Sequence, residues 1–200
     1  HFPEELGTID KLTLQFDDER FLGTPVDFFA SYSLCKVDRN DEQIRVDGEK
    51  LQELQGSLPP PFAQKNERVI ETLSEGPYYL ASGDNQGSDT AFAVYTGLRY
   101  NLDQEWMNNP KFGMEYNYGS QYWVGLNIAD RDPFHKLNIR GQAYEGYWIQ
   151  PLVEDKFQAR IGYKYLKRDY TTSLLSGVFG EPREVDETAK VFYLDLNVMF

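Results

Sequence analysis

Cysteine, long hydrophobic runs and positive charge are all scarce in this chain of 200 residues. The one cysteine, Cys35, cannot form a disulfide within the chain, and no Cys-x-x-Cys-His motif is present to attach a c-type haem. No stretch approaches the ~18 to 20 consecutive apolar residues of a membrane-spanning helix. Lys and Arg number 20 against 32 Asp and Glu, a net charge of -12, which argues against nucleic acid as a partner.

Aromatic residues are abundant, with 14 Tyr and 13 Phe, and the hydrophobic fraction of 40% is too high for a disordered chain. The mean hydropathy is -0.59. That low value does not exclude the membrane, because a transmembrane barrel places apolar residues at every second position only. The composition therefore leaves both soluble and membrane-embedded β-structure open.

The dominant pattern along the chain is an alternation of apolar and polar residues, which is typical of β-strands. Segments with this period predict about seven strands, mostly near the ~9 to 11 residues that a tilted strand needs to cross a bilayer. They are 11–18, 25–36, 91–101, 111–118, 136–150, 156–166 and 192–200. In 136–150 the alternation is less regular, because Glu145 interrupts a face shared by Leu137, Ile139, Ala143 and Tyr147.

The apolar face of these strands is rich in aromatic and aliphatic residues, whereas the other face carries charges of both signs. A barrel with a lipid-facing apolar band and a polar interior gives this pattern. The predicted lipid-facing set includes Phe112, Met114, Tyr116, Phe157, Ile161, Phe192, Leu194 and Leu196. A soluble antiparallel barrel with a dry interior is the alternative, because alternation does not say which face is wet.

The connectors between the predicted strands alternate in length. The long ones are 38–88, 119–135 and 171–186, and the short ones are 19–24, 102–110 and 151–155. Outer-membrane barrels have long extracellular loops and short periplasmic turns. We therefore predict an all-β fold, a transmembrane antiparallel up-and-down barrel in the bacterial outer membrane, with 1–200 belonging to one barrel domain. Segment 38–88 is then a long acidic extracellular loop or a constriction insert.

The last segment closes on an alternating set of aromatic and aliphatic residues. These are Phe192, Leu194, Leu196, Val198 and Phe200. They resemble the signal by which the outer-membrane assembly machinery recognises its substrates. An odd strand count differs from the even counts of single-chain bacterial barrels. We therefore expect this chain to be the C-terminal portion of a larger barrel, with upstream strands or another chain supplying the rest.

Charged residues at the polar positions are the candidate lining of a lumen. They are Arg99, Lys111, Glu115, Arg140, Arg160, Lys164 and Asp195. Arg140, Arg160 and Lys164 are expected to form one basic patch that would filter anions. Ion pairing that simply fills a narrow barrel is the alternative.

Few residues offer metal or catalytic chemistry. Asp84, Asn85 and Asp89 form a weak calcium candidate that lacks the EF-hand spacing, and Asp130 and Asp132 precede His135 in a turn-like segment. The two histidines, His1 and His135, are too few for the His clusters of barrel hydrolases. We expect no catalytic residues, no resident metal and no cofactor.

Three stretches carry a resemblance to a known family. They contain Glu115-Tyr-Asn-Tyr-Gly-Ser-Gln-Tyr-Trp123, Arg140-Gly-Gln-Ala-Tyr144 and Arg160-Ile-Gly-Tyr-Lys-Tyr165. Residues 90–200 resemble the C-terminal half of a family of uncharacterised porin-like outer-membrane proteins of metal-reducing and sulfur-metabolising bacteria, sometimes found beside multihaem cytochromes. The resemblance implies a channel for small polar or ionic solutes. The alternative is a structural sleeve that holds a partner such as a multihaem cytochrome or a surface assembly.

Overall fold

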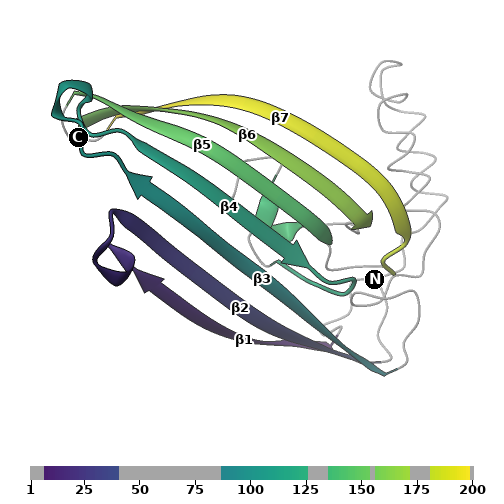
Figure 1. Cartoon of the computed structure of the whole chain (residues 1–200). Helices are drawn as coiled ribbons and strands as arrows, with labels where there is room; N and C mark the ends of the chain where they lie inside the picture. Colours follow the sequence, from purple (N-terminus) through teal and green to yellow (C-terminus); the bar gives the residue numbers. More distant parts are fainter. Residues whose placement is uncertain (1–6, 41–86, 126–134, 154–155, 172–180, 199–200) are drawn as a thin grey trace, which may run out of the picture.

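The computed structural model describes residues 7–40, 87–125, 135–153, 156–171 and 181–198. Seven strands form one antiparallel sheet in which each strand pairs with the next along the chain (Figure 1). They are β1 (Gly7–Asp18), β2 (Val26–Arg39), β3 (Ser88–Asn101), β4 (Lys111–Gly119), β5 (Gly141–Val153), β6 (Phe157–Tyr170) and β7 (Glu184–Val198). The predicted all-β, up-and-down antiparallel fold with seven strands is confirmed.

Short 3-10 turns are the other regular elements in the described parts of the chain: η1 (Phe21–Gly23), η2 (Glu105–Met107) and η3 (Lys136–Asn138). None of the described residues belongs to a helix long and apolar enough to cross a membrane. Successive connectors alternate between the two ends of the sheet, so η1 and η2 lie at one end. The segments after β2, β4 and β6 leave the other end.

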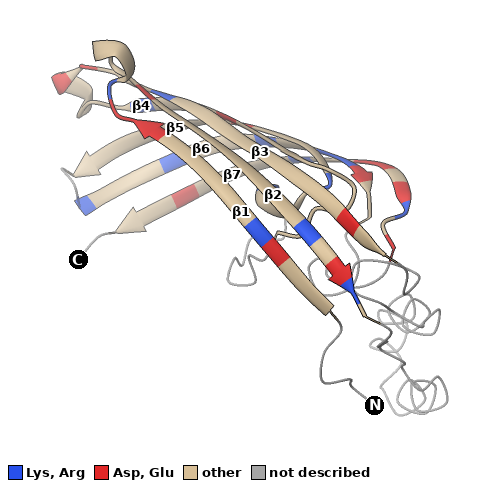
Figure 2. Cartoon of the chain, turned by 90° about the horizontal axis from the view of Figure 1, so that it is seen from below, with Lys and Arg blue, Asp and Glu red and all other residues tan. Residues whose placement is uncertain are grey.

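The sheet is a curved, open layer (Figure 2). β1 and β7 are its two edges and are not paired with each other, so the described strands do not close into a barrel. Both edge strands run in the same direction, because an even number of reversals separates them in an up-and-down sheet.

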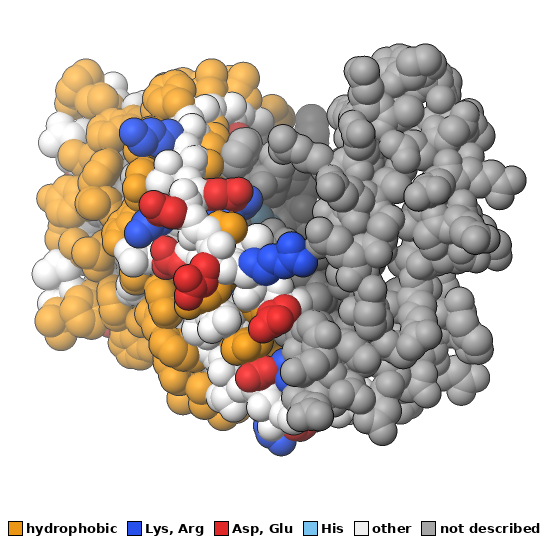
Figure 3. Space-filling view, turned by 90° about the vertical axis from the view of Figure 1, so that its right-hand side faces the viewer, with side chains coloured by type: hydrophobic (Ala, Val, Ile, Leu, Met, Phe, Trp, Pro, Cys, Tyr) orange, Lys and Arg blue, Asp and Glu red, His pale blue; other side chains and the backbone are white. Residues whose placement is uncertain are grey.

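The two faces of the sheet differ sharply in chemistry. Large hydrophobic side chains are exposed on the convex face: Met114 is 58% exposed, Leu196 60% and Phe192 72%. Phe112, Ile161 and Leu194, from the predicted lipid-facing set, are exposed there as well. Hydrophobic side chains gather along this outer side, and charged side chains occupy a separate zone beside it (Figure 3).

The concave face holds the buried side chains. One apolar cluster joins Cys35, Val37, Ala91 and Ala93 of β2 and β3 to Trp123 and Val124, which follow β4. A second cluster contains Ile139, Ala143 and Leu166. Trp123, Val124 and Ile139, which lie outside the strands, therefore pack onto the concave face.

The expectation for 136–150 is wrong in two respects. The strand begins only at Gly141, and η3 occupies the residues before it. Glu145 does not interrupt a lipid-facing row: it is buried with Ala143 and Tyr147 on the concave face, while Tyr144 is exposed on the other. The apolar residues of this strand are inward-facing because they surround a buried polar cluster, which alternation of hydropathy cannot distinguish from lipid contact.

Candidate functional site: a charge cluster on the concave face

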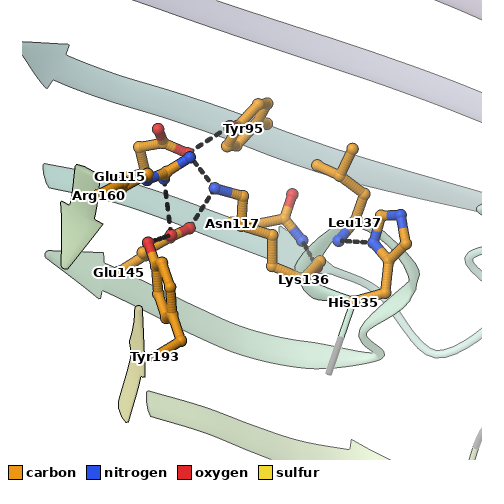
Figure 4. Close-up of polar contacts among 9 residues, drawn as sticks. All are labelled: Tyr95, Glu115, Asn117, His135, Lys136, Leu137, Glu145, Arg160 and Tyr193. Atoms are coloured by element: carbon orange, nitrogen blue, oxygen red, sulfur yellow. Dashed lines mark hydrogen bonds and ion pairs between the residues drawn. The ribbon is translucent and has the colours of Figure 1, made fainter. Parts of the chain in front are cut away.

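Six side chains, each from a different element, meet on the concave face and form what we call the concave-face cluster (Figure 4). They are Tyr95 of β3, Glu115 of β4, Lys136 of η3, Glu145 of β5, Arg160 of β6 and Tyr193 of β7. Inward positions alternate along each strand, and antiparallel pairing sets these positions side by side. The cluster spans the sheet from β3 to β7.

Lys136 is the centre of the cluster. Its ammonium is ion-paired with both Glu115 and Glu145. The carboxylate side chains are 8% and 2% exposed, and Lys136 itself is 17% exposed. A buried carboxylate is costly unless it is paired and hydrogen-bonded, and here two buried carboxylates share the Lys136 ammonium.

Glu145 accepts hydrogen bonds from three side chains of the cluster. Besides Lys136, it accepts a hydrogen bond from the Tyr193 hydroxyl, and Arg160 Nη2 lies 2.8 Å from its Oε1. The Arg160 guanidinium also lies over the ring of Tyr147, 3.9 Å from the centroid. Tyr95 donates to Glu115. Two cations and two carboxylates thus balance, and the cluster carries no net charge.

Glycines make room for these aromatic side chains. A Cβ on Gly113 of β4 would collide with the Tyr147 ring, and one on Gly162 of β6 would collide with the ring of Tyr193. Tyr147 and Gly162 are paired across β5 and β6. Each tyrosine ring packs against a glycine of a neighbouring strand, because that glycine has no side chain at the contact.

Two hydrogen bonds hold η3 over β4 and the segment after it, and a third caps the turn. Asn117 Nδ2 donates to the Lys136 carbonyl at 2.6 Å, and Trp123 Nε1 donates to the Leu137 carbonyl at 2.9 Å. The Leu137 amide donates to His135 Nδ1 at 3.0 Å. The position of the Lys136 ammonium is therefore set by the η3 turn and not by a strand.

Arg140 is fully buried outside the strands. Its Nε donates to the Trp123 carbonyl at 2.9 Å and its Nη1 to the Thr171 carbonyl at 3.0 Å. Burial disfavours the charged guanidinium and lowers the pKa of Arg140 to about 10. This residue ties together the segments that follow β4 and β6.

The predicted lumen charges are distributed over several environments. Glu115 and Arg160 belong to the concave-face cluster, and Arg99 is ion-paired with Asp27 at 2.7 Å. Asp195 is the register partner of Arg160. Lys111 is half-buried at the start of β4.

The expected basic patch has a different arrangement in the structure. Lys164 and Arg160 both approach the Tyr193 ring, at 5.1 and 5.6 Å from its centroid. Arg140 instead contacts backbone carbonyls, and Arg160 is offset by Glu145.

The weak metal and acid–base candidates do not form a site within the described residues. Asp84, Asn85, Asp130 and Asp132 lie outside them, as do most of segment 38–88 and Phe200. Asp89 is ion-paired with Arg39, and His135 accepts the Leu137 amide. Across the described ranges, no three His, Cys, Asp or Glu side chains gather as a metal site would require.

Sequence reasoning missed four members of the cluster: Tyr95, Lys136, Glu145 and Tyr193. The one sequence signal for Glu145 is that it interrupts a row of apolar residues, because a charged residue in such a row must be paired if the row is buried. Tyr95 and Tyr193 occupy polar positions of their strands, and the sequence does not show that their hydroxyls donate to buried carboxylates. Lys136 lies outside any strand, and no local pattern marks it.

The fold and the cluster define a class: a curved antiparallel sheet with an apolar outer face and an ion-paired inner face. A family model described as "Protein of unknown function (DUF3373)" matches residues 2–199, and the chain belongs to this family. The match therefore includes residues 2–89 as well as the stretch 90–200 on which the sequence resemblance was based. No curated protein matches the chain.

Proposed function

We propose that this sheet is part of the wall of a transmembrane β-barrel in the bacterial outer membrane, and that the barrel is a porin-like channel for small polar or ionic solutes. The distribution of side chains over the two faces carries the proposal. Leu, Met, Phe and Tyr side chains are exposed on the convex face, whereas the ion pairs are buried on the concave face.

The exposed hydrophobic side chains of the convex face would be stable in contact with a lipid bilayer but not in contact with water. Monomeric soluble proteins rarely expose large contiguous apolar patches, because such patches aggregate. Facing lipid, the same side chains gain hydrophobic burial, and the charged side chains stay on the protected side. Strand lengths of 9 to 15 residues reach or exceed the ~9 to 11 residues that span a membrane.

The two open edges support closure by further strands. Unpaired backbone groups of β1 and β7 would be costly in lipid, where no water can satisfy them. Because β1 and β7 run in the same direction, closing the sheet with antiparallel pairs requires an odd number of additional strands. Another part of the protein or another chain would supply them. The exposed Phe192, Leu194, Leu196 and Val198 would serve as the assembly signal.

Fractionation and planar-bilayer recording of the full-length protein test this proposal. We expect the protein to partition with outer membranes, to need detergent, and to give steady ion conductance after reconstitution. A protein that stays soluble and monomeric without detergent would overturn the membrane assignment.

A structural sleeve is the second candidate, and the filled part of the concave face favours it. Trp123, Val124 and the η3 turn occupy space that an open channel would leave to water. A sleeve would show no conductance alone and would co-purify with a partner, such as a multihaem cytochrome, detected by its haem absorbance.

A further inference from the structure

A pocket of about 320 Å³ lies on the concave face beside the concave-face cluster, with which it shares Tyr95. β1 to β4 form its floor, and the segment that carries Trp123 forms one wall. Its polar lining includes Lys11, Thr13, Ser31, Ser33 and Tyr95. The volume is at the lower end of the range of small-molecule sites.

The described side chains that line the pocket are either positively charged or neutral. Thr13 and Ser33 hydroxyls are hydrogen-bonded at 2.9 Å across β1 and β2. The Lys11 ammonium lies 4.4 Å from the centroid of the Trp123 ring. Among the described residues that line the pocket, Lys11 is the only charged one, and none is an Asp or Glu.

Lys11 differs from the paired cations of the same face. Lys136, Arg160, Arg99 and Arg39 each form an ion pair with a carboxylate. Among the described residues, none of the ion pairs includes Lys11. Within the described part of the chain, the pocket therefore combines an ammonium without a carboxylate partner, neighbouring hydroxyl groups and an aromatic wall.

We infer that this pocket is a subsite for a small organic anion, a carboxylate whose charge lies on Lys11 and whose carbon skeleton lies against Trp123. An ammonium and hydroxyl groups supply the charge-assisted hydrogen bonds that carboxylates accept. At ~30 Å³ for each water-sized group, the pocket has room for on the order of ten non-hydrogen atoms. The inference rests on the proposed channel for its role in transport, and it names the solute class that the channel would favour.

The test uses Trp123 as an internal reporter. The full-length protein with Trp106→Phe and Trp148→Phe, in detergent, keeps Trp123 as the only tryptophan of residues 1–200. Sodium succinate is the probe, and succinamide is its neutral isostere. We expect a saturable change in Trp123 emission with succinate and at least a tenfold weaker response to succinamide. An equal response to both would overturn the inference.

Two variants separate the site from general effects of charge. Lys11→Gln is expected to weaken succinate binding at least tenfold. Lys111→Gln removes a cation from the concave face outside the pocket and is expected to leave binding unchanged. Thr13→Val provides a second variant that keeps the Lys11 charge and is expected to weaken binding severalfold. Unchanged binding in both Lys11→Gln and Thr13→Val would overturn the inference.

Failure of the channel and failure of the subsite give different results. Succinate binding to a protein without conductance would reject the channel and leave the anion site standing. Conductance by a protein whose Trp123 emission ignores succinate would reject the subsite and keep the channel.

Discussion

Glu145 of β5 forms an ion pair with Arg160 of β6, although the residue directly opposite Glu145 in the strand register is Lys164. Arg160 itself lies opposite Ile149, so its side chain reaches diagonally along β5 to the carboxylate. On the way it crosses the ring of Tyr147 at 3.9 Å from the centroid. The Lys164 ammonium lies over the Tyr193 ring instead. The ion pair therefore joins residues on one face that are diagonal, not directly opposite, in the strand register.

Glu145→Gln should destabilise the protein strongly. The amide keeps the size of the side chain but removes the negative charge shared by Lys136 and Arg160. Removing one partner of a buried ion pair leaves an uncompensated charge, so we expect a loss of about 3 kcal/mol in the free energy of unfolding. Urea titration of the full-length protein in detergent micelles measures it. Asp186→Asn is the matched control, because Asp186 is 87% exposed and 3.9 Å from Lys167, and no measurable change is expected.

Lys136 and Glu115 should be energetically coupled. Lys136→Met and Glu115→Gln each break the ion pair, whereas the double variant removes both charges at once. We expect the double variant to be about 1 to 3 kcal/mol more stable than the sum of the single losses predicts. Simple additivity in a double-mutant cycle would show that the two residues do not act on each other.

Leu194→Arg distinguishes lipid from water on the convex face. Leu194 is 58% exposed, and in water an arginine at an exposed strand position is tolerated. In a bilayer the same change is expected to cost ~2 to 4 kcal/mol and to lower the amount of protein assembled in the outer membrane. Asn197→Arg, on the opposite face of β7, serves as the control and should assemble normally. Equal assembly of both variants would contradict a lipid-facing convex surface.

Gly113→Ala should disturb the cluster without changing any charge. An added methyl group would collide with the Tyr147 ring, over which the Arg160 guanidinium lies. Overpacking of this kind typically costs about 1 to 3 kcal/mol. Gly146→Ala is the control within the neighbouring strand, because nothing lies within 4 Å of its added Cβ. We expect Gly146→Ala to be neutral or slightly stabilising, as measured by thermal unfolding in detergent.

Much of the sheet could be predicted from local pattern. The alternation in 25–36, 91–101, 111–118 and 156–166 matches β2, β3, β4 and β6 closely. The final strand starts earlier, at Glu184, because its first residues are charged on both faces and show no alternation. In β5 the period was right and the face was wrong, since Ala143 and Tyr147 surround the buried Glu145.

The sequence by itself determined that the chain forms about seven amphipathic strands with alternating long and short connectors, and that charges of both signs lie on one face. A period of two is a local property, because it follows from the geometry of each strand alone. Only the tertiary structure decided which charges meet. The partners of Glu145 come from η3, β6 and β7, and their distances depend on register, twist and the return of η3 onto the concave face. For the same reason only the folded sheet placed Lys11 beside Trp123, with no carboxylate partner among the residues that the structure describes.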